Sequence, residues 1–118
     1  MDGMSLYIVQ TNAVEGRDDE FNEWYDSTHV PDVLSIDGFE SAQRFKRSTA
    51  LDQPDVPTPP YEYSVLYEVS GDPVAAIDRL RAAVVGGRIE LTDAMVPGSG
   101  SLLLTSLGSK VLASNRGD

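Results

Sequence analysis

The chain has 118 residues, with nine Lys or Arg and 19 Asp or Glu, so its formal net charge is −10. Cysteine is absent, which excludes disulfides, thiol catalysis and cysteinyl metal sites. No apolar run is long enough to span a membrane, and Met1-Asp2-Gly3 does not begin a signal peptide. We therefore expect a single domain over residues 1–118, located in the cytoplasm.

The acidity is concentrated in residues 1–40, which contain ten acids and a single base, Arg17. Such a surface repels nucleic acids and acidic membranes, so we expect neither as a partner. An acidic helix face is most often simply a solvated surface that aids solubility. If the acids instead surround a site, they favour a neutral or cationic ligand.

Residues 4–11 are rich in strand-forming side chains and predict a first strand. Residues 17–29 predict a helix, because an apolar stripe recurs at helical spacing. We expect Pro31 to end this helix and to begin a short second turn over 31–35. The stripe consists of Phe21, Trp24, Tyr25 and Thr28.

Residues 39–47 predict a second strand, with Phe39 and Phe45 on one face and Arg44 on the other. Residues 48–60 contain four prolines and predict a loop or extended arm. Residues 61–69 give the clearest strand pattern in the chain. One face of that strand has Tyr61, Tyr63, Val65, Tyr67 and Val69.

A second helix is predicted over residues 73–85, begun by Asp72-Pro73 and ended by Gly86-Gly87. Its expected inward residues are Val74, Ile77, Leu80 and Val84. A last strand follows at 101–107.

The order β-α-β-β-α-β predicts an α+β, ferredoxin-like fold, in which both helices cover one face of an antiparallel sheet. The other sheet face needs a cover. We expect the stripe of the 61–69 strand and one face of the first strand to be covered by a second copy, which gives a homodimer.

His29 is the only histidine, and it follows Asp26 and precedes Asp32 by three residues. An imidazole beside carboxylates can act as a general acid or base near neutral pH. The alternative is structural, because a histidine at a helix end interacts favourably with the helix dipole. The same residues offer weak metal ligation at best, and we expect no metal site.

Tyr61, Tyr63 and Tyr67 share one strand face and can either line a pocket for a flat ligand or pack a dimer interface. Arg44 can bind an anionic ligand or pair with the acidic helix. Trp24 and Tyr25 are aromatic residues at helical spacing, which is typical of a core.

The stretch Phe21-Asn22-Glu23-Trp24-Tyr25-Asp26-Ser27-Thr28-His29-Val30-Pro31-Asp32, followed by Gly38-Phe39, resembles the dimeric α/β-barrel superfamily and within it the EthD-like group. This resemblance implies a sheet-to-sheet homodimer with a ligand cavity in each protomer. It also implies that His29 faces the cavity, that Trp24 and Tyr25 form its wall and that Asp32 orients the histidine. The family motif often has Pro-Gly where this chain has Asp37-Gly38.

The function expected is a cofactor-independent enzyme of the isomerase, cyclase or dehydratase type, acting on a small cyclic, aromatic or polyketide-like metabolite. A non-catalytic binding or accessory protein and a cofactor-free monooxygenase are the alternatives. Haem, which some relatives bind, would have only His29 as an imidazole ligand, and we expect no cofactor. The expected catalytic residues are His29, Asp32 and Tyr25, and the expected substrate-binding residues are Phe21, Asn22, Trp24, Arg44, Tyr61, Tyr63 and Tyr67.

Overall fold

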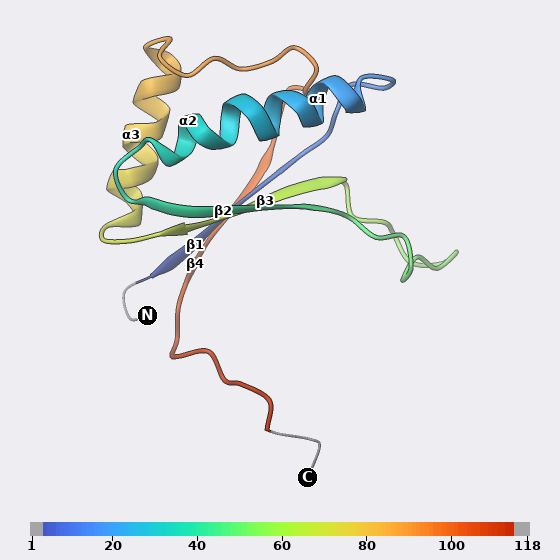
Figure 1. Cartoon of the computed structure of the whole chain (residues 1–118). Helices are drawn as coiled ribbons and strands as arrows, with labels where there is room; N and C mark the ends of the chain where they lie inside the picture. Colours follow the sequence, from blue (N-terminus) through green and yellow to red (C-terminus); the bar gives the residue numbers. More distant parts are fainter. Residues whose placement is uncertain (1–3, 115–118) are drawn as a thin grey trace.

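The computed structural model describes residues 4–114. Four strands form one antiparallel sheet in the order β2-β3-β1-β4, and the helices lie together on one of its faces (Figure 1). This arrangement confirms the predicted α+β, ferredoxin-like fold. The elements are β1 (Ser5–Thr11), α1 (Asp18–Trp24), the π-helical turn η1 (Tyr25–His29), α2 (Val30–Leu34), β2 (Phe39–Lys46), β3 (Tyr63–Val69), α3 (Pro73–Val85) and β4 (Gly100–Thr105).

The tyrosine and valine stripe of β3 packs under the helices. Tyr63, Val65, Tyr67 and Val69 are all buried in the core, together with Phe21 and Val33 of the helical segment. The expectation that a second copy covers this stripe is therefore wrong. Burial against the helices removes the same apolar side chains from water within one chain.

The sheet face that remains open is the other one. Across it, Ile8 pairs with Leu66 and Leu102, and Leu6 pairs with Leu104. Leu102 on the edge strand β4 is 52% exposed, and Phe45 on the opposite edge strand β2 is 44% exposed. Within residues 4–114 no helix covers these side chains, and a contiguous apolar sheet face of this kind is rare on a monomer.

A β-bulge reverses the predicted faces of β2. The register with β3 shifts between Phe39 and Ser41, so that Phe39 is opposite Val69 while Ala42 is opposite Tyr67. Phe39 and Arg44 consequently lie on the same, helix-facing side, and Phe45 lies on the open side. The prediction that Phe39 and Phe45 share a face was wrong because one extra residue changes the alternation of every later side chain.

Helix α3 begins as predicted, because the Asp72 side chain accepts hydrogen bonds from the backbone N–H groups of Val74 and Ala75 at 3.0 and 3.3 Å. Its inward face differs in part from the prediction. Val74 is exposed, and the small residue Ala76 is buried instead. A Cβ atom at Gly38 would lie 2.9 Å from Ala76 Cβ, and Gly38 has φ +103°, so this close approach of helix and loop requires glycine.

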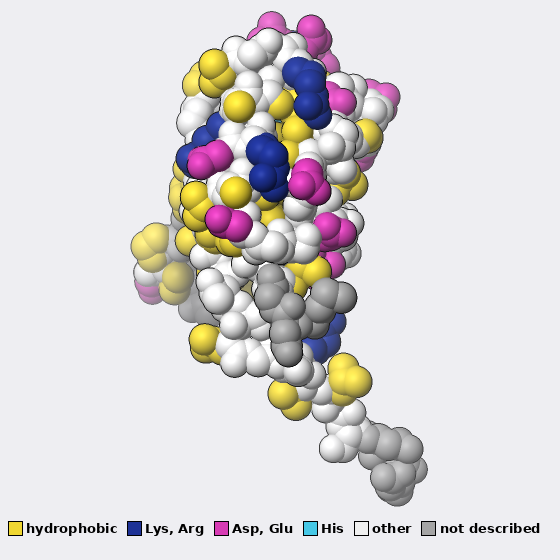
Figure 2. Space-filling model, turned by 90° about the vertical axis from the view of Figure 1, so that its left-hand side faces the viewer, with side chains coloured by type: hydrophobic (Ala, Val, Ile, Leu, Met, Phe, Trp, Pro, Cys, Tyr) yellow, Lys and Arg dark blue, Asp and Glu magenta, His cyan; other side chains and the backbone are white. Residues whose placement is uncertain are grey.

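Two segments extend away from the sheet, namely the proline-rich arm at 48–60 and residues 106–114 after β4 (Figure 1). Viewed from the α3 side, acidic and basic side chains are interspersed with small apolar patches, and hydrophobic side chains also project from the tail below (Figure 2). None of the helices in residues 4–114 combines the length and apolar character needed to cross a membrane.

Candidate functional site

The first helical segment runs without interruption from Asp18 to Leu34, and its middle turn is π-helical. In this turn the N–H of Val30 donates to the carbonyl of Tyr25, five residues earlier. Pro31 then lies in the first turn of α2, where a missing N–H has little cost. The prediction that the helix ends before Pro31 was wrong, because the wide turn restarts the helix at a point that tolerates proline.

The π-turn also determines which side chains point inward. Tyr25 is buried and His29 is partly buried, whereas Thr28 is exposed, contrary to the predicted stripe. A wide turn adds one residue to the helical repeat, so the inward position passes from Thr28 to His29. Single π-turns of this kind occur frequently at functional sites.

The His29 ring is fixed by aromatic contacts. It stacks on Trp24 with ring centroids 4.5 Å apart and an interplanar angle of 18°, and it meets Tyr25 edge-on at 5.1 Å. These contacts position the imidazole, which forms no side-chain hydrogen bond with any residue in the range 4–114. Trp24 therefore supports the histidine ring by stacking on it. It does not itself line the cavity that contains His29.

A cavity of about 370 Å³ lies between the sheet, η1, α3 and the segment that precedes β4. Its lining is predominantly apolar, and the polar groups among its aliphatic side chains belong to three tyrosines, Thr11, His29, Arg81 and Ser99. Size and composition both fit a site for a small organic molecule. The lining residues are Tyr7, Val9, Thr11, Tyr25, His29, Tyr67, Leu80, Arg81, Val84, Val85, Leu91, Met95 and Ser99.

Burial keeps His29 neutral. It lowers the pKa of the imidazole to about 4, and the charge of Asp32 offsets only part of this effect. The Nδ1 atom is buried and has no hydrogen-bond partner among residues 4–114. At neutral pH the ring is thus an uncharged imidazole, which has one nitrogen that accepts a proton and one that donates a hydrogen bond.

Two of the three tyrosines that line the cavity, Tyr25 and Tyr67, are buried. Tyr67 is 1% exposed, and its hydroxyl has no hydrogen-bond partner in the described chain. Burial raises the pKa of Tyr67, and burial also raises the pKa of Tyr25 to about 12, against the opposing charge of Arg44. Both phenols are therefore protonated at neutral pH and can donate hydrogen bonds. A buried hydroxyl without a partner is unusual in a folded protein.

Arg44 lies on the far side of Tyr25 and does not line the cavity. Its guanidinium carbon is 4.4 Å from the centre of the Tyr25 ring, within the range of a cation–π contact. Nη1 donates to Asp26 Oδ1 at 3.0 Å, and Nη2 donates to Asn22 Oδ1 at 2.8 Å. Of the two roles predicted for Arg44, binding an anionic ligand or pairing with the acidic helix, the structure shows the second.

Of the predicted site residues, the structure brings together His29, Tyr25 and Tyr67. Phe21 is in the core, and Tyr63 donates a hydrogen bond to Asp18 Oδ2 at 2.6 Å outside the cavity. Tyr61 packs against Gly100. Asp32 acts on His29 through its charge, and no hydrogen bond joins the two in the described residues, so its role as the group that orients His29 stays a prediction.

The cavity walls formed by β1, by α3 and by the segment before β4 were not predicted from the sequence. The alternation of Tyr7, Val9 and Thr11 could have placed these three together on one strand face. Leu80, Arg81, Val84 and Val85 form a stripe on α3 whose orientation depends on how that helix packs. The segment containing Leu91 and Met95 has no local signal, because its position results from tertiary contacts.

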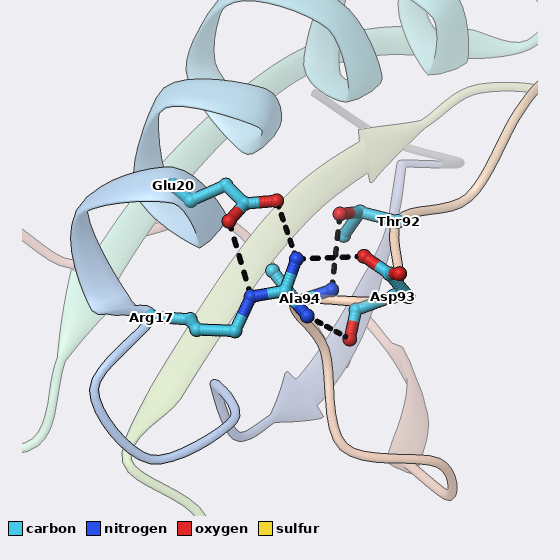
Figure 3. Close-up of polar contacts among 5 residues, drawn as sticks. All are labelled: Arg17, Glu20, Thr92, Asp93 and Ala94. Atoms are coloured by element: carbon cyan, nitrogen blue, oxygen red, sulfur yellow. Dashed lines mark hydrogen bonds and ion pairs between the residues drawn. The ribbon is translucent and has the colours of Figure 1, made fainter.

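Those tertiary contacts centre on Arg17, which joins the start of α1 to the segment before β4 (Figure 3). Its guanidinium donates to both carboxylate oxygens of Glu20, to Asp93 Oδ1 at 2.7 Å and to the Asp93 carbonyl at 3.1 Å. These hydrogen bonds, those with Glu20 foremost, raise the pKa of Arg17. The backbone pairing of Ala13 with Met95 continues the attachment and places Met95 in the cavity wall.

The described residues hold no cluster of three or more His, Asp or Glu side chains suited to a metal ion. No curated protein matches the chain. Solved structures do match, but at low sequence identity, so that they support the fold alone.

A protein from Shewanella loihica PV-4 proposed to be a monooxygenase has a TM-score of 0.58 and 13% identity, with 92% of this chain and 99% of that chain covered. HapK from Hahella chejuensis has a TM-score of 0.57 and 16% identity, with 93% and 99% covered. An EthD family protein from Bacillus halodurans C-125 has a TM-score of 0.50 and 13% identity, with 92% and 99% covered. The predicted likeness to the EthD-like, ferredoxin-like group is thus confirmed for the fold. Residues 4–73 match the family model described as domain of unknown function DUF4286, and the chain belongs to this family.

Proposed function

We propose that the protein is a cofactor-independent enzyme that moves a proton on a small cyclic, aromatic or polyketide-like metabolite. The observation that carries this proposal is the pair of unpartnered polar groups, the His29 imidazole and the Tyr67 hydroxyl, in one largely apolar cavity. Leaving such groups unpaired costs stability, so a ligand that supplies their partners is the simplest explanation.

The chemistry follows from the protonation states. Neutral His29 accepts a proton from a carbon next to a carbonyl group of the substrate. The phenol of Tyr67, or that of Tyr25, donates a hydrogen bond to the enolate oxygen that develops as the proton leaves. Return of the proton to another carbon gives an isomer, and loss of a leaving group gives a dehydration. The apolar walls exclude water and strengthen each of these interactions.

The test is a thermal-shift screen of the wild-type protein against aromatic, lactone and polyketide-like metabolites, with mass spectrometry on every compound that raises the melting temperature. We expect at least one stabilising compound to be converted. His29→Asn should lower its turnover by about 10²- to 10⁴-fold, the usual contribution of a general base. The matched control is Glu23→Gln, an exposed position on the same helical segment, and it should retain wild-type turnover.

Full turnover in His29→Asn would reject the catalytic role of the histidine. Conversely, compounds that bind tightly to both proteins and are never changed would favour a binding or accessory protein. That outcome would support the cavity as the ligand site and would reject the proposal that the protein catalyses a reaction there.

A cofactor-free monooxygenase is the second candidate, and it is favoured by the fold shared with the Shewanella loihica protein. In this reaction His29 would remove a proton from the substrate, and the resulting substrate anion would react directly with O₂. Conversion of a CH₂ group and O₂ into C=O and H₂O balances without any other reductant. Oxygen uptake that matches product formation one to one distinguishes this reaction, whereas the isomerase reading requires none.

We further propose that the open sheet face forms a homodimer. Two of the fold's relatives, from Jannaschia sp. CCS1 and Thermobifida fusca YX, are described as dimeric ferredoxin-like proteins. Burial of Ile8, Leu66 and Leu102 against a second sheet would remove this apolar face from water. Light scattering should give a dimer for the wild type and for Leu51→Glu in the arm, but a monomer for Leu102→Glu.

A further inference from the structure

Among the described residues, Arg81 is the only one with a permanent charge in the cavity lining. It lies on α3 beside Leu80 and close to Val84 and Val85, all of which line the same space. The acids that give the chain its net charge of −10 are absent from this lining. The permanent charge at the cavity wall therefore has the opposite sign to the net charge of the protein.

Arg81 also differs from the other arginines of the described chain. Arg17, Arg44, Arg47 and Arg79 each have a carboxylate within 4.0 Å, and Arg88 donates to Ser35 Oγ at 3.0 Å. Arg81 has neither an ion pair nor a side-chain hydrogen bond within residues 4–114, although this acidic chain offers acids in abundance, including Asp78 one turn earlier. Its guanidinium remains available for two parallel hydrogen bonds to a planar anion, which is the geometry that arginine suits best.

A second, independent observation fixes the other end of the ligand. The Tyr67 hydroxyl is buried and has no hydrogen-bond partner within residues 4–114, and Tyr67 lines the same cavity. Most of the other lining residues are aliphatic or aromatic. The cavity thus combines an exposed cationic residue with a buried neutral donor and an extensive apolar surface.

We propose that the cavity takes a monoanionic carboxylic acid with a cyclic or aromatic body, whose carboxylate binds Arg81. This inference rests on the proposed function, for which it specifies the substrate class. It reverses the sequence-based expectation of a neutral or cationic ligand. That expectation placed the acid excess around His29, whereas none of those acids is among the residues that line the cavity.

The test uses matched pairs of probes that differ in charge but hardly in shape, namely benzoic acid and benzamide, and 2-naphthoic acid and 2-naphthamide. Titration calorimetry at low salt should show that the wild type binds the better acid about three- to tenfold more tightly than its amide. Arg81→Gln should abolish this preference, and Arg81→Glu should reverse it. The preference should shrink as the salt concentration rises, because Arg81 is exposed.

Arg79→Gln is the matched control, because Arg79 is exposed on the same helix, is near Asp37 and does not line the cavity. It should retain the wild-type preference for the acid. All three variants change exposed side chains, and a cooperative thermal unfolding transition should verify that each of them folds.

Equal binding of acid and amide by the wild type, or a preference that persists in Arg81→Gln, would overturn the proposal. So would a failure of every acid to bind. The proposed function can fail separately, since acids that bind through Arg81 but are never converted support this inference and reject catalysis of those compounds. If the amides bind and the acids do not, the cavity would still be a ligand site, but its proposed preference for an anion would be rejected.

Discussion

Tyr25 lies between two polar clusters that differ in how completely their groups are paired. On one side, Arg44 donates to Asp26 and Asn22 and lies over the Tyr25 ring. On the other side, the His29 Nδ1 and the Tyr67 hydroxyl are buried and have no partner among the described residues. Both clusters come from the same helical segment and the same sheet. Paired groups hold the fold together, whereas unpaired groups reduce stability and remain free for a ligand.

The largest expected effect concerns the pH dependence of stability. The folded pKa of His29 is about 4, below the ordinary value of 6.5, so the unfolded chain binds a proton more readily. Stability from the neutral buried ring is therefore present above pH 6.5 and is lost as the pH falls toward 4. This loss amounts to about 3 kcal/mol in the free energy of unfolding.

Urea unfolding of the wild type and of His29→Asn at pH 7 and pH 4 measures this contribution. Between pH 7 and pH 4 the free energy of unfolding of the wild type should fall by about 3 kcal/mol more than that of the variant. The other titrating groups are common to both proteins. An equal loss in the two proteins would show that His29 is not held neutral by burial.

The next effect concerns Arg44 in the paired cluster. Arg44→Leu should reduce the free energy of unfolding by about 2 kcal/mol, because it removes two charge-assisted hydrogen bonds and a cation–π contact. The comparison variant is Arg47→Leu, which loses one ion pair with Asp52 and should cost less than about 1 kcal/mol. A stability of Arg44→Leu equal to that of the wild type would mean that this cluster is not structural.

Two tyrosines of β3 permit a direct contrast of smaller size. Tyr67→Phe removes a buried hydroxyl that has no partner and should leave stability unchanged or raise it by about 1 kcal/mol. Tyr63→Phe removes a hydroxyl that donates to Asp18 and should lower stability by about 1 kcal/mol. Thermal unfolding followed by circular dichroism compares them. Destabilisation of Tyr67→Phe by more than Tyr63→Phe would contradict the difference drawn between the clusters.

The smallest effect is expected at Arg17, on the surface. Arg17→Gln should weaken ligand binding about two- to fivefold, because it loosens the segment that provides Leu91 and Met95 to the cavity wall. Calorimetry with the best probe acid measures this change. Arg47→Gln, whose ion pair lies in the arm, should bind as the wild type does, and an equal loss in both variants would show a general effect of charge.

Much of the fold could be predicted from local patterns. Alternating apolar residues located the strands, and Asp72-Pro73 located the start of α3, because these signals involve neighbours in the sequence. The bulge after Phe39 and the π-turn at 25–29 could not be predicted in this way. Each adds a residue to a regular repeat, and the added residue is stable only because the surrounding core accepts it.

The candidate site likewise has features that follow from the local sequence and features that depend on packing between distant elements. The sequence by itself determined that His29 is the one imidazole, that it lies beside Trp24 and Tyr25, and that the order of elements is ferredoxin-like. Only the tertiary structure decided that Arg44 is paired outside the cavity while Arg81, from a helix distant in sequence, lies within it. The physical reason is that the state of a charge depends on which partners and how much water surround it, and both are determined by packing between elements far apart in the chain.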